Sequence, residues 1–132
     1  METKIQDRAE KYFWAGYNCA ESVLWAAAET FDLGLRPADV RLATGLGGGL
    51  GRGDVCGALS GVVLALGAVA GRTDPGQSQE SFKALREKVV ATFEAEFKSI
   101  RCNELKTEER EDCVAFVRTA AAALARVMEG LP

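Results

Sequence analysis

VCGALSGVVLALGAVA, residues 55–70, is the most apolar stretch of the chain and decides its fold. Its sixteen residues contain three glycines and no charged side chain, whereas a membrane-spanning helix needs about 20 residues. We therefore predict a buried central helix, with a membrane segment as the alternative. Four small residues in this stretch would let neighbouring helices approach closely: Gly57, Gly61, Ala65 and Ala68.

Helical periodicity dominates the rest of the chain, and strand patterns are weak. Asn18 and Glu21 have the spacing of a capping box at the start of a helix. The predicted helices cover residues 2–14, 19–30 and 37–43, a central helix capped by Asp54 and ending near Gly71, a longer helix from residue 78, and a last helix capped by Thr107 and ending at Gly130. The predicted fold is all-α: residues 1–132 form a compact single-domain bundle of five to six helices around a buried Gly/Ala-rich central helix.

Composition narrows the classes of function. The net charge is −3, and no run of Lys and Arg forms the basic patch that nucleic-acid binding needs. The first residues, METKIQDRAEKYFW, mix both charges and lack the apolar core of a secretory signal. We therefore expect a cytoplasmic protein that binds no nucleic acid and has no membrane span.

The chain has four cysteines and no histidine, so the cysteines are its main candidates for metal binding or redox chemistry. Cys19, Cys56 and Cys113 are predicted near helix N-termini, and Cys102 lies in a loop beside Arg101. Both settings lower the pKa of a thiol and favour the thiolate. Any single cysteine could instead be a small core residue, but their common placement favours a functional role. The spacings contain no CxxC pair, so neither a thioredoxin motif nor a zinc ribbon is indicated.

Glycines crowd the segment just before Cys56, in LGGGLGRGDVCGALSG, residues 46–61. Glycine permits positive φ angles and close approach of the backbone to another group. The segment matches neither the phosphate-binding loop nor the dinucleotide fingerprint, because no Lys-Ser/Thr follows it and no strand precedes it. We expect either a tight turn or backbone N–H groups lying close to a bound group, with Gly47, Gly48, Gly49, Gly51 and Gly53 as the candidate residues.

These motifs together resemble a bacterial and archaeal family of redox-active proteins, C_GCAxxG_C_C, defined by four cysteines and the motif Cys-Gly-Ala-x-x-Gly. Residues 56–61, CGALSG, match that motif, and residues 18–21, NCAE, resemble the first cysteine site. The run Gly47-Gly48-Gly49 and the pair Cys102 and Cys113 complete the pattern, which covers roughly residues 16–123. The resemblance implies a redox role beside oxidoreductase or transporter components. Some relatives are fused to cytochrome-like modules, which favours an iron–sulfur centre.

The sequence supports three hypotheses of function. In the leading hypothesis, Cys19, Cys56, Cys102 and Cys113 ligate an iron–sulfur cluster for electron transfer, and the glycines let backbone N–H groups approach its sulfurs. The second hypothesis is an enzyme that exchanges thiols and disulfides, in which one low-pKa cysteine attacks and a neighbouring one resolves. The same four cysteines are then the candidate redox thiols, with no metal bound. The third is a binding module built on a structural Cys₄ zinc site. The expected partner is a redox protein such as an oxidoreductase component, and a second copy of the chain is a further candidate.

Overall fold

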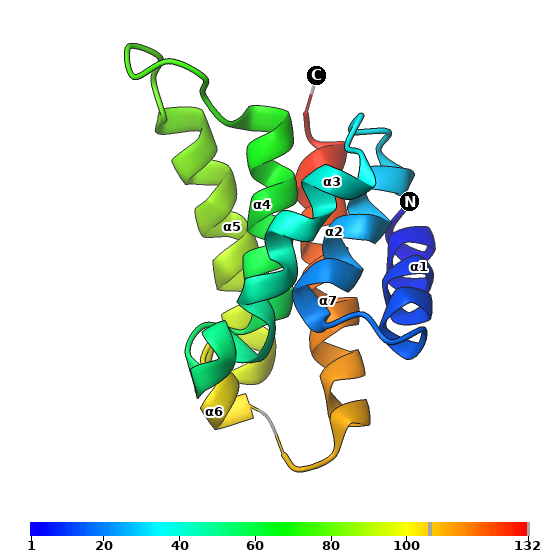
Figure 1. The fold of residues 1–132 in the computed structure, drawn as a ribbon. Helices are drawn as coiled ribbons and strands as arrows, with labels where there is room; N and C mark the ends of the chain where they lie inside the picture. Colours follow the sequence, from blue (N-terminus) through cyan, green and yellow to red (C-terminus); the bar gives the residue numbers. More distant parts are fainter. Residues whose placement is uncertain (106, 132) are drawn as a thin grey trace.

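The computed structural model describes residues 1–105 and 107–131. Within this part the chain forms five long α-helices and two of a single turn (Figure 1). The elements are α1 (Glu2–Trp14), α2 (Cys19–Thr30), α3 (Pro37–Val40), η1 (Arg41–Leu46), η2 (Gly49–Gly53), α4 (Gly57–Ala70), α5 (Glu80–Phe97), α6 (Cys102–Leu105), η3 (Arg110–Asp112) and α7 (Cys113–Glu129). The all-α class is confirmed, but the expected five to six helices become seven because α3 and α6 are separate four-residue helices.

Several boundaries follow from local chemistry that the sequence made visible. The Asn18 side chain accepts a hydrogen bond from the backbone N–H of Glu21, and the Glu21 carboxylate accepts one from the N–H of Asn18. The predicted capping box is therefore present, and α2 begins at Cys19. The predicted ranges of α1 and α2 are both confirmed. Pro37 occupies the first turn of α3, where its missing N–H costs nothing.

Other boundaries were predicted wrongly. Asp54 does not cap α4, because residues 54–56 are extended and pair with residues 100–102, so the helix starts only after Cys56. The predicted helix 37–43 ends as an α-helix at Val40 and continues as a 3₁₀ turn to Leu46. The long helix begins at Glu80, two residues later than expected. Thr107 accepts the N–H of Glu109 in a turn, and the last helix starts only at Cys113.

The core lies where α4 packs against α2 and α7, with α1 and α5 on the outside (Figure 1). The inner face of α4 is fully buried and consists mainly of small and branched residues, which confirms the predicted Gly/Ala-rich central helix. A row of buried alanines on α7 faces this core, so the helices can lie close together: Ala120, Ala121, Ala123 and Ala125. In the described part of the chain, every helix is too short or too polar to cross a membrane.

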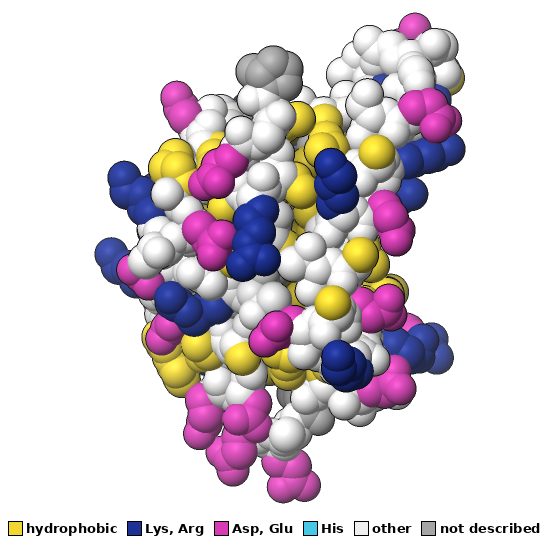
Figure 2. Space-filling model, turned by 180° about the vertical axis from the view of Figure 1, so that it is seen from behind, with side chains coloured by type: hydrophobic (Ala, Val, Ile, Leu, Met, Phe, Trp, Pro, Cys, Tyr) yellow, Lys and Arg dark blue, Asp and Glu magenta, His cyan; other side chains and the backbone are white. Residues whose placement is uncertain are grey.

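Helix direction gives the bundle two chemically different ends. The helices α2, α4 and α7 all begin toward the end that is lower in Figure 1, where α6 also lies. The C-terminus is at the upper end, and the N-terminus lies at the side of the bundle, at the start of α1. Asp and Glu side chains gather at the lower end (Figure 2). The exposed segment 108–112, which leads into α7, carries four acidic residues and one arginine. The N-termini of several helices therefore meet at one end, which is a favourable place for negative charge.

Candidate functional site

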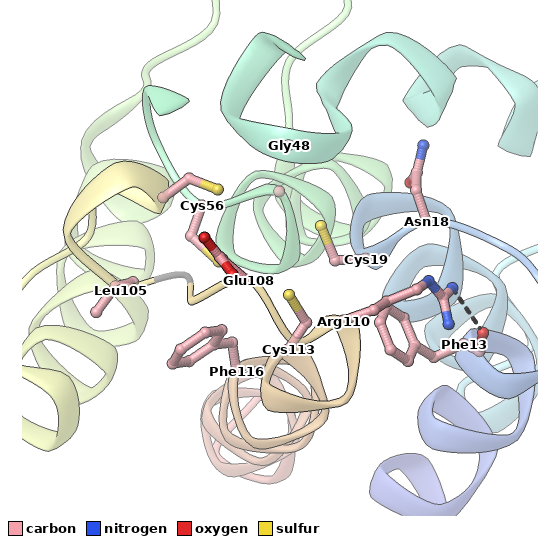
Figure 3. A pocket seen from close by; sticks show the side chains of 12 residues that line it. Phe13, Asn18, Cys19, Gly48, Cys56, Leu105, Glu108, Arg110, Cys113 and Phe116 are labelled. Carbon is pink, nitrogen blue, oxygen red and sulfur yellow. Dashed lines mark hydrogen bonds between the residues drawn. The ribbon is translucent and has the colours of Figure 1, made fainter. Parts of the chain in front are cut away.

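Each of the four cysteines stands at the beginning of a helix. Cys19, Cys102 and Cys113 are the first residues of α2, α6 and α7, and Cys56 immediately precedes α4. All four line one cavity of about 250 Å³ (Figure 3), which we call the cysteine cavity. Its wall is completed by Phe13, Asn18, Gly48, Gly57, Leu105, Glu108, Arg110 and Phe116. The structure thus brings together cysteines that are up to 94 positions apart in the chain.

Two glycines of the CGALSG motif allow α2 and α4 to touch. A Cβ on Gly57 would lie 2.5 Å from the Sγ of Cys19, and a Cβ on Gly61 would lie 2.6 Å from the carbonyl oxygen of Ala20. Real side chains do not fit at such distances, so both positions require glycine for this packing. The motif therefore places the Cys19 sulfur directly against the first turn of α4, next to Cys56. This confirms the expected close approach at these two glycines.

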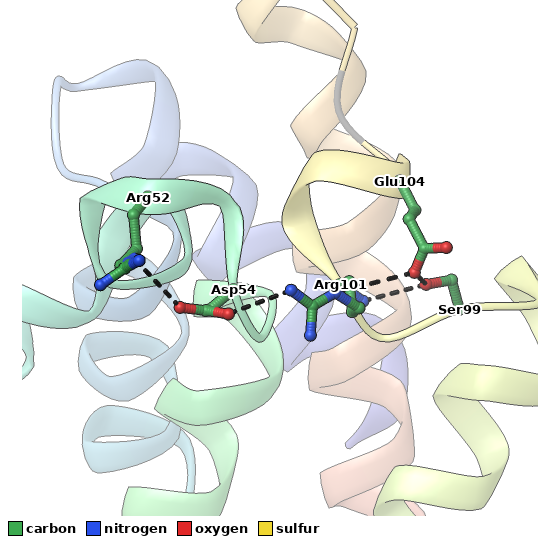
Figure 4. Close-up of polar contacts among 5 residues, drawn as sticks. All are labelled: Arg52, Asp54, Ser99, Arg101 and Glu104. Carbon is green, nitrogen blue, oxygen red and sulfur yellow. Dashed lines mark hydrogen bonds and ion pairs between the residues drawn. The ribbon is translucent and has the colours of Figure 1, made fainter.

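The pairing of residues 54–56 with residues 100–102 brings Cys56 and Cys102 together. The N–H of Cys56 donates to the carbonyl of Ile100 at 2.7 Å, and the N–H of Cys102 donates to the carbonyl of Asp54 at 2.6 Å. Side chains reinforce the pairing on the outside, because Arg101 lies 3.1 Å from the carboxylate of Asp54 (Figure 4). Arg52 and Glu104 extend this exposed network on either side. The extended segment before α4 and the segment that leads into α6 are thus joined at the cavity wall.

Arg110 links the segment that precedes Cys113 to the end of α1 and the turn that follows it. Its Nη2 atom donates to the carbonyl oxygens of Phe13 and Tyr17, each at 2.9 Å, and its guanidinium lies 3.8 Å above the centre of the Phe13 ring. Figure 3 shows Arg110 on the wall of the cavity beside Cys113, with the Cys19 and Cys113 sulfurs facing the same space. Sequence reasoning missed Arg110 as a site residue. The signal was its position as the single basic residue within the acidic run EEREDC.

The five candidate glycines have different roles. Among the described residues, Gly48 lines the cavity, whereas Gly47, Gly49, Gly51 and Gly53 do not. Residues 48–51 all have positive φ and form a left-handed turn. A Cβ added to Gly49 would lie only 2.5 Å from the backbone nitrogen of Asp54. Gly47 fits against the side chain of Asn18, and Gly53 against that of Asn103. Most of the glycines therefore shape the loop that carries Cys56.

Burial dominates the electrostatics of Cys56. It is 4% exposed, and this burial raises the pKa of its thiol to about 12, with neighbouring Cys19 and Cys102 adding to the increase. Hydrogen bonds from the backbone N–H groups of Leu59 and Ala58 oppose the rise without cancelling it. The expected lowering of the pKa at a helix N-terminus is therefore wrong for Cys56, because desolvation outweighs the helix end. The charged side chains on the described cavity wall are Glu108 and Arg110.

The arrangement of the side chains decides whether a site for one metal ion is already formed. Across residues 1–105 and 107–131, no group of three or more His, Cys, Asp or Glu side chains is placed to hold a metal ion. The four cysteines instead stand around a cavity of about 250 Å³. The donor set is that of a thiolate-ligated centre, but the described side chains form no preformed site for one ion.

Comparison with known proteins identifies the family. A sequence model of the family described as "Putative redox-active protein (C_GCAxxG_C_C)" matches residues 17–127. Searches of curated proteins and of solved structures gave no match. The matched range contains all four cysteines and most of the chain, so the chain belongs to this redox-active family.

Proposed function

We propose that this member of the family is an electron-transfer protein whose cysteine cavity holds an iron–sulfur cluster. Cys19, Cys56, Cys102 and Cys113 would be the ligands, because four thiolates are the usual ligand set of such clusters. The observation that carries the proposal is that all four cysteines, each at the beginning of a helix, line one cavity. When bound, the cluster would supply a one-electron redox centre.

The lack of a preformed one-ion site among the described residues favours a cluster over a single ion. A tetrahedral zinc site needs its four ligands close around one atom. The cysteines stand around a cavity of about 250 Å³ and form no preformed site for one ion within the described residues. Ligands of a cluster bind to different iron atoms and can therefore stand further apart. This argument ranks the iron–sulfur centre above the structural zinc site.

The surroundings of the cavity fit a charged, sheltered centre. Helix N-termini carry partial positive charge, which favours the anionic form of thiolates and of a cluster bound to them. Backbone N–H groups of Ala58 and Leu59 already reach the Cys56 sulfur, and such hydrogen bonds tune reduction potential. Phe13, Leu105 and Phe116 make part of the wall apolar, which limits access of water. The first turn of α4 thus supplies the backbone contacts that the sequence assigned to the glycines upstream.

Thiol–disulfide exchange is the second candidate, and the position of the Cys19 sulfur against Gly57, the residue after Cys56, favours it. The Cys19 thiolate would attack a partner disulfide and release one partner thiolate. Cys56 would then attack the mixed disulfide, leaving a Cys19–Cys56 disulfide and the reduced partner dithiol. The high pKa of Cys56 makes its thiolate scarce at neutral pH and slows this second step. We therefore rank this function below the cluster.

A redox protein of this size needs an electron donor and an acceptor. We propose a protein partner of the oxidoreductase class and a cytoplasmic setting, where the reducing environment keeps thiols available for ligation. The acidic end around the cavity favours a partner whose contact surface is basic.

The deciding experiment is anaerobic purification followed by an absorption spectrum and analysis of iron, sulfide and zinc. We expect visible absorption bands and iron together with acid-labile sulfide. Cys56→Ser should abolish the iron while leaving the helical circular dichroism intact, because a serine hydroxyl is nearly isosteric but does not ionise at neutral pH. Ser60→Ala, one turn further along α4, is the matched control and should keep the iron.

Two results would contradict the cluster. Zinc without iron in the parent chain would favour the structural site, and a metal-free parent that cycles between dithiol and disulfide would favour exchange. Full iron occupancy in Cys56→Ser would remove Cys56 from the ligand set.

A further inference from the structure

Arg110 connects two segments that lead into different cysteines. It lies three residues before Cys113, and it donates to the carbonyl of Tyr17, which lies two residues before Cys19. Its second acceptor, the carbonyl of Phe13, belongs to the last turn of α1. The start of α7 is thereby fastened to the turn between α1 and α2, at the edge of the cysteine cavity (Figure 3).

We infer that Arg110 is a positioning residue that fixes Cys113 relative to Cys19, an inference that rests on the proposed role of the cysteine cavity. Cys19 is held against Gly57, at the start of α4, by the packing of α2 on α4 and needs no help from Arg110. Cys113 begins a helix that follows an exposed segment, 107–112, and Arg110 ties this segment to α1. The inference therefore applies to one cysteine pair and leaves the other untouched.

The contact requires the shape of arginine. A planar guanidinium can stack on the Phe13 ring and donate in its plane to two carbonyls at once. A lysine ammonium retains the charge but neither stacks as a plane nor presents a fixed fork of donors. Replacement by lysine thus separates the geometry of Arg110 from its charge.

The test measures which cysteines lie close enough to be cross-linked, in the reduced protein freed of metal by a chelator. A short bis-methanethiosulfonate reagent links neighbouring thiols, and peptide mass spectrometry gives the ratio of the Cys19–Cys113 product to the Cys19–Cys56 product. We expect Arg110→Gln to lower this ratio roughly tenfold, the population change that corresponds to losing a charged hydrogen bond. Arg110→Lys should lower it nearly as much.

Two controls isolate the effect. Arg118→Gln removes a cation that joins α7 to Asp7 and Glu10 of α1, away from the cavity, and should leave the ratio unchanged. Glu111→Gln removes an acidic charge from the same segment outside the cavity wall and should also leave it unchanged. An unchanged ratio in Arg110→Gln, an equal fall in Arg118→Gln, or no Cys19–Cys113 product in the parent would overturn the inference.

The same preparation separates this inference from the proposed function. Iron is measured in the parent before the chelator is added, and its absence would count against the cluster alone. The cross-linking ratio is measured without metal and tests Arg110 alone.

Discussion

The cysteine cavity has two halves that the chain holds by different means. The first half, Cys19 and Cys56, stands on α2 and α4, which pack through Gly57 and Gly61 with almost no space between them. The second half, Cys102 and Cys113, stands on the single turn α6 and on the first residue of α7. Backbone pairing at residues 100–102, exposed ion pairs and Arg110 hold this second half in place.

This difference has an energetic consequence. Buried packing between helices contributes several kcal/mol, whereas an exposed ion pair contributes about 0–1 kcal/mol. Segments held by few buried contacts open at a lower free energy than the core of the same protein. We therefore expect the first half to be rigid and the second half to open first, which would admit a bound group past Cys102 and Cys113.

The largest expected effect comes from the glycines of the first half. Gly61→Ala places a methyl against Ala20 and should lower the free energy of unfolding by about 1–3 kcal/mol, despite the better helix propensity of alanine. Gly57→Ala should cost a similar amount and also displace the Cys19 sulfur, so that iron is lost. Chemical unfolding and iron analysis measure the two effects.

Gly67 of the same helix provides the matched control. Among the described residues, no atom outside the adjoining backbone of α4 lies within 4 Å of a Cβ added there, so Gly67→Ala should stabilise the protein by up to about 1 kcal/mol. If Gly61→Ala were as stable as Gly67→Ala, the close packing of α2 on α4 would not hold the first half together.

The next effect concerns the left-handed turn at residues 48–51, which links η1 to the segment 54–56 that pairs with residues 100–102. Gly49→Ala should be the most damaging of three variants, because its Cβ would strike the Asp54 backbone, whose carbonyl accepts the N–H of Cys102. Gly48→Ala and Gly51→Ala have open space and should each cost about 1–2 kcal/mol of strain from positive φ. Of these two, Gly48→Ala alone should also lose iron, since Gly48 faces the cavity.

Unfolding midpoints and iron content of the three variants measure these effects. Equal iron content in the Gly48 and Gly51 variants would mean that the turn shapes the loop and makes no close approach to a bound group.

The sequence allowed the first half to be predicted and left the second half largely hidden. The capping box at Asn18 and the small residues at Gly57 and Gly61 are local patterns. The first determines where α2 begins, and the second determines how closely α2 and α4 pack. The pairing of residues 54–56 with 100–102 joins positions more than 40 residues apart and has no strand pattern. The boundary at Asp54 was misplaced for that reason.

Arg110 was hidden for a related physical reason. Its acceptors are the backbone carbonyls of Phe13 and Tyr17. Every residue has a backbone carbonyl, so the amino-acid sequence does not show which of them accept hydrogen bonds from Arg110. The raised pKa of Cys56 was likewise unpredictable, because the helix start is visible in the sequence while the depth of burial depends on the folded bundle.

A smaller effect is expected at the ion pairs of the second half. Arg101→Gln removes the contact with Asp54 at 3.1 Å and should change the free energy of unfolding by less than about 1 kcal/mol, since Arg101 is half exposed. The variant should nevertheless accelerate hydrogen exchange at the N–H of Cys102, relative to the parent, more than it accelerates exchange at the N–H groups inside α4. Unchanged exchange at Cys102 would show that the backbone pairing alone holds the second half.

The smallest effect lies at the opposite end of the bundle and gives the reference value for an exposed ion pair. Arg126 donates to Glu2 through Nε at 3.0 Å and Nη2 at 3.4 Å, and the hydrogen bond to Arg126 lowers the pKa of the Glu2 carboxyl. A lowered carboxyl pKa stabilises the fold above the ordinary pKa of glutamate, and this contribution is lost as the pH falls through the lowered value. Glu2→Gln should therefore cost less than about 1 kcal/mol at pH 7 and almost nothing near pH 2.

Urea unfolding of the parent and of Glu2→Gln across this pH range measures the difference. Arg126→Gln should give the same loss, and the double variant should lose no more than either single one, because all three remove one interaction. Iron content should be unchanged in all of them, since this pair joins the start of α1 to the end of α7, far from the cysteine cavity (Figure 1). A larger loss than that of Arg101→Gln would reverse the ranking of exposed ion pairs, and the second half would then not be the weakest part of the fold.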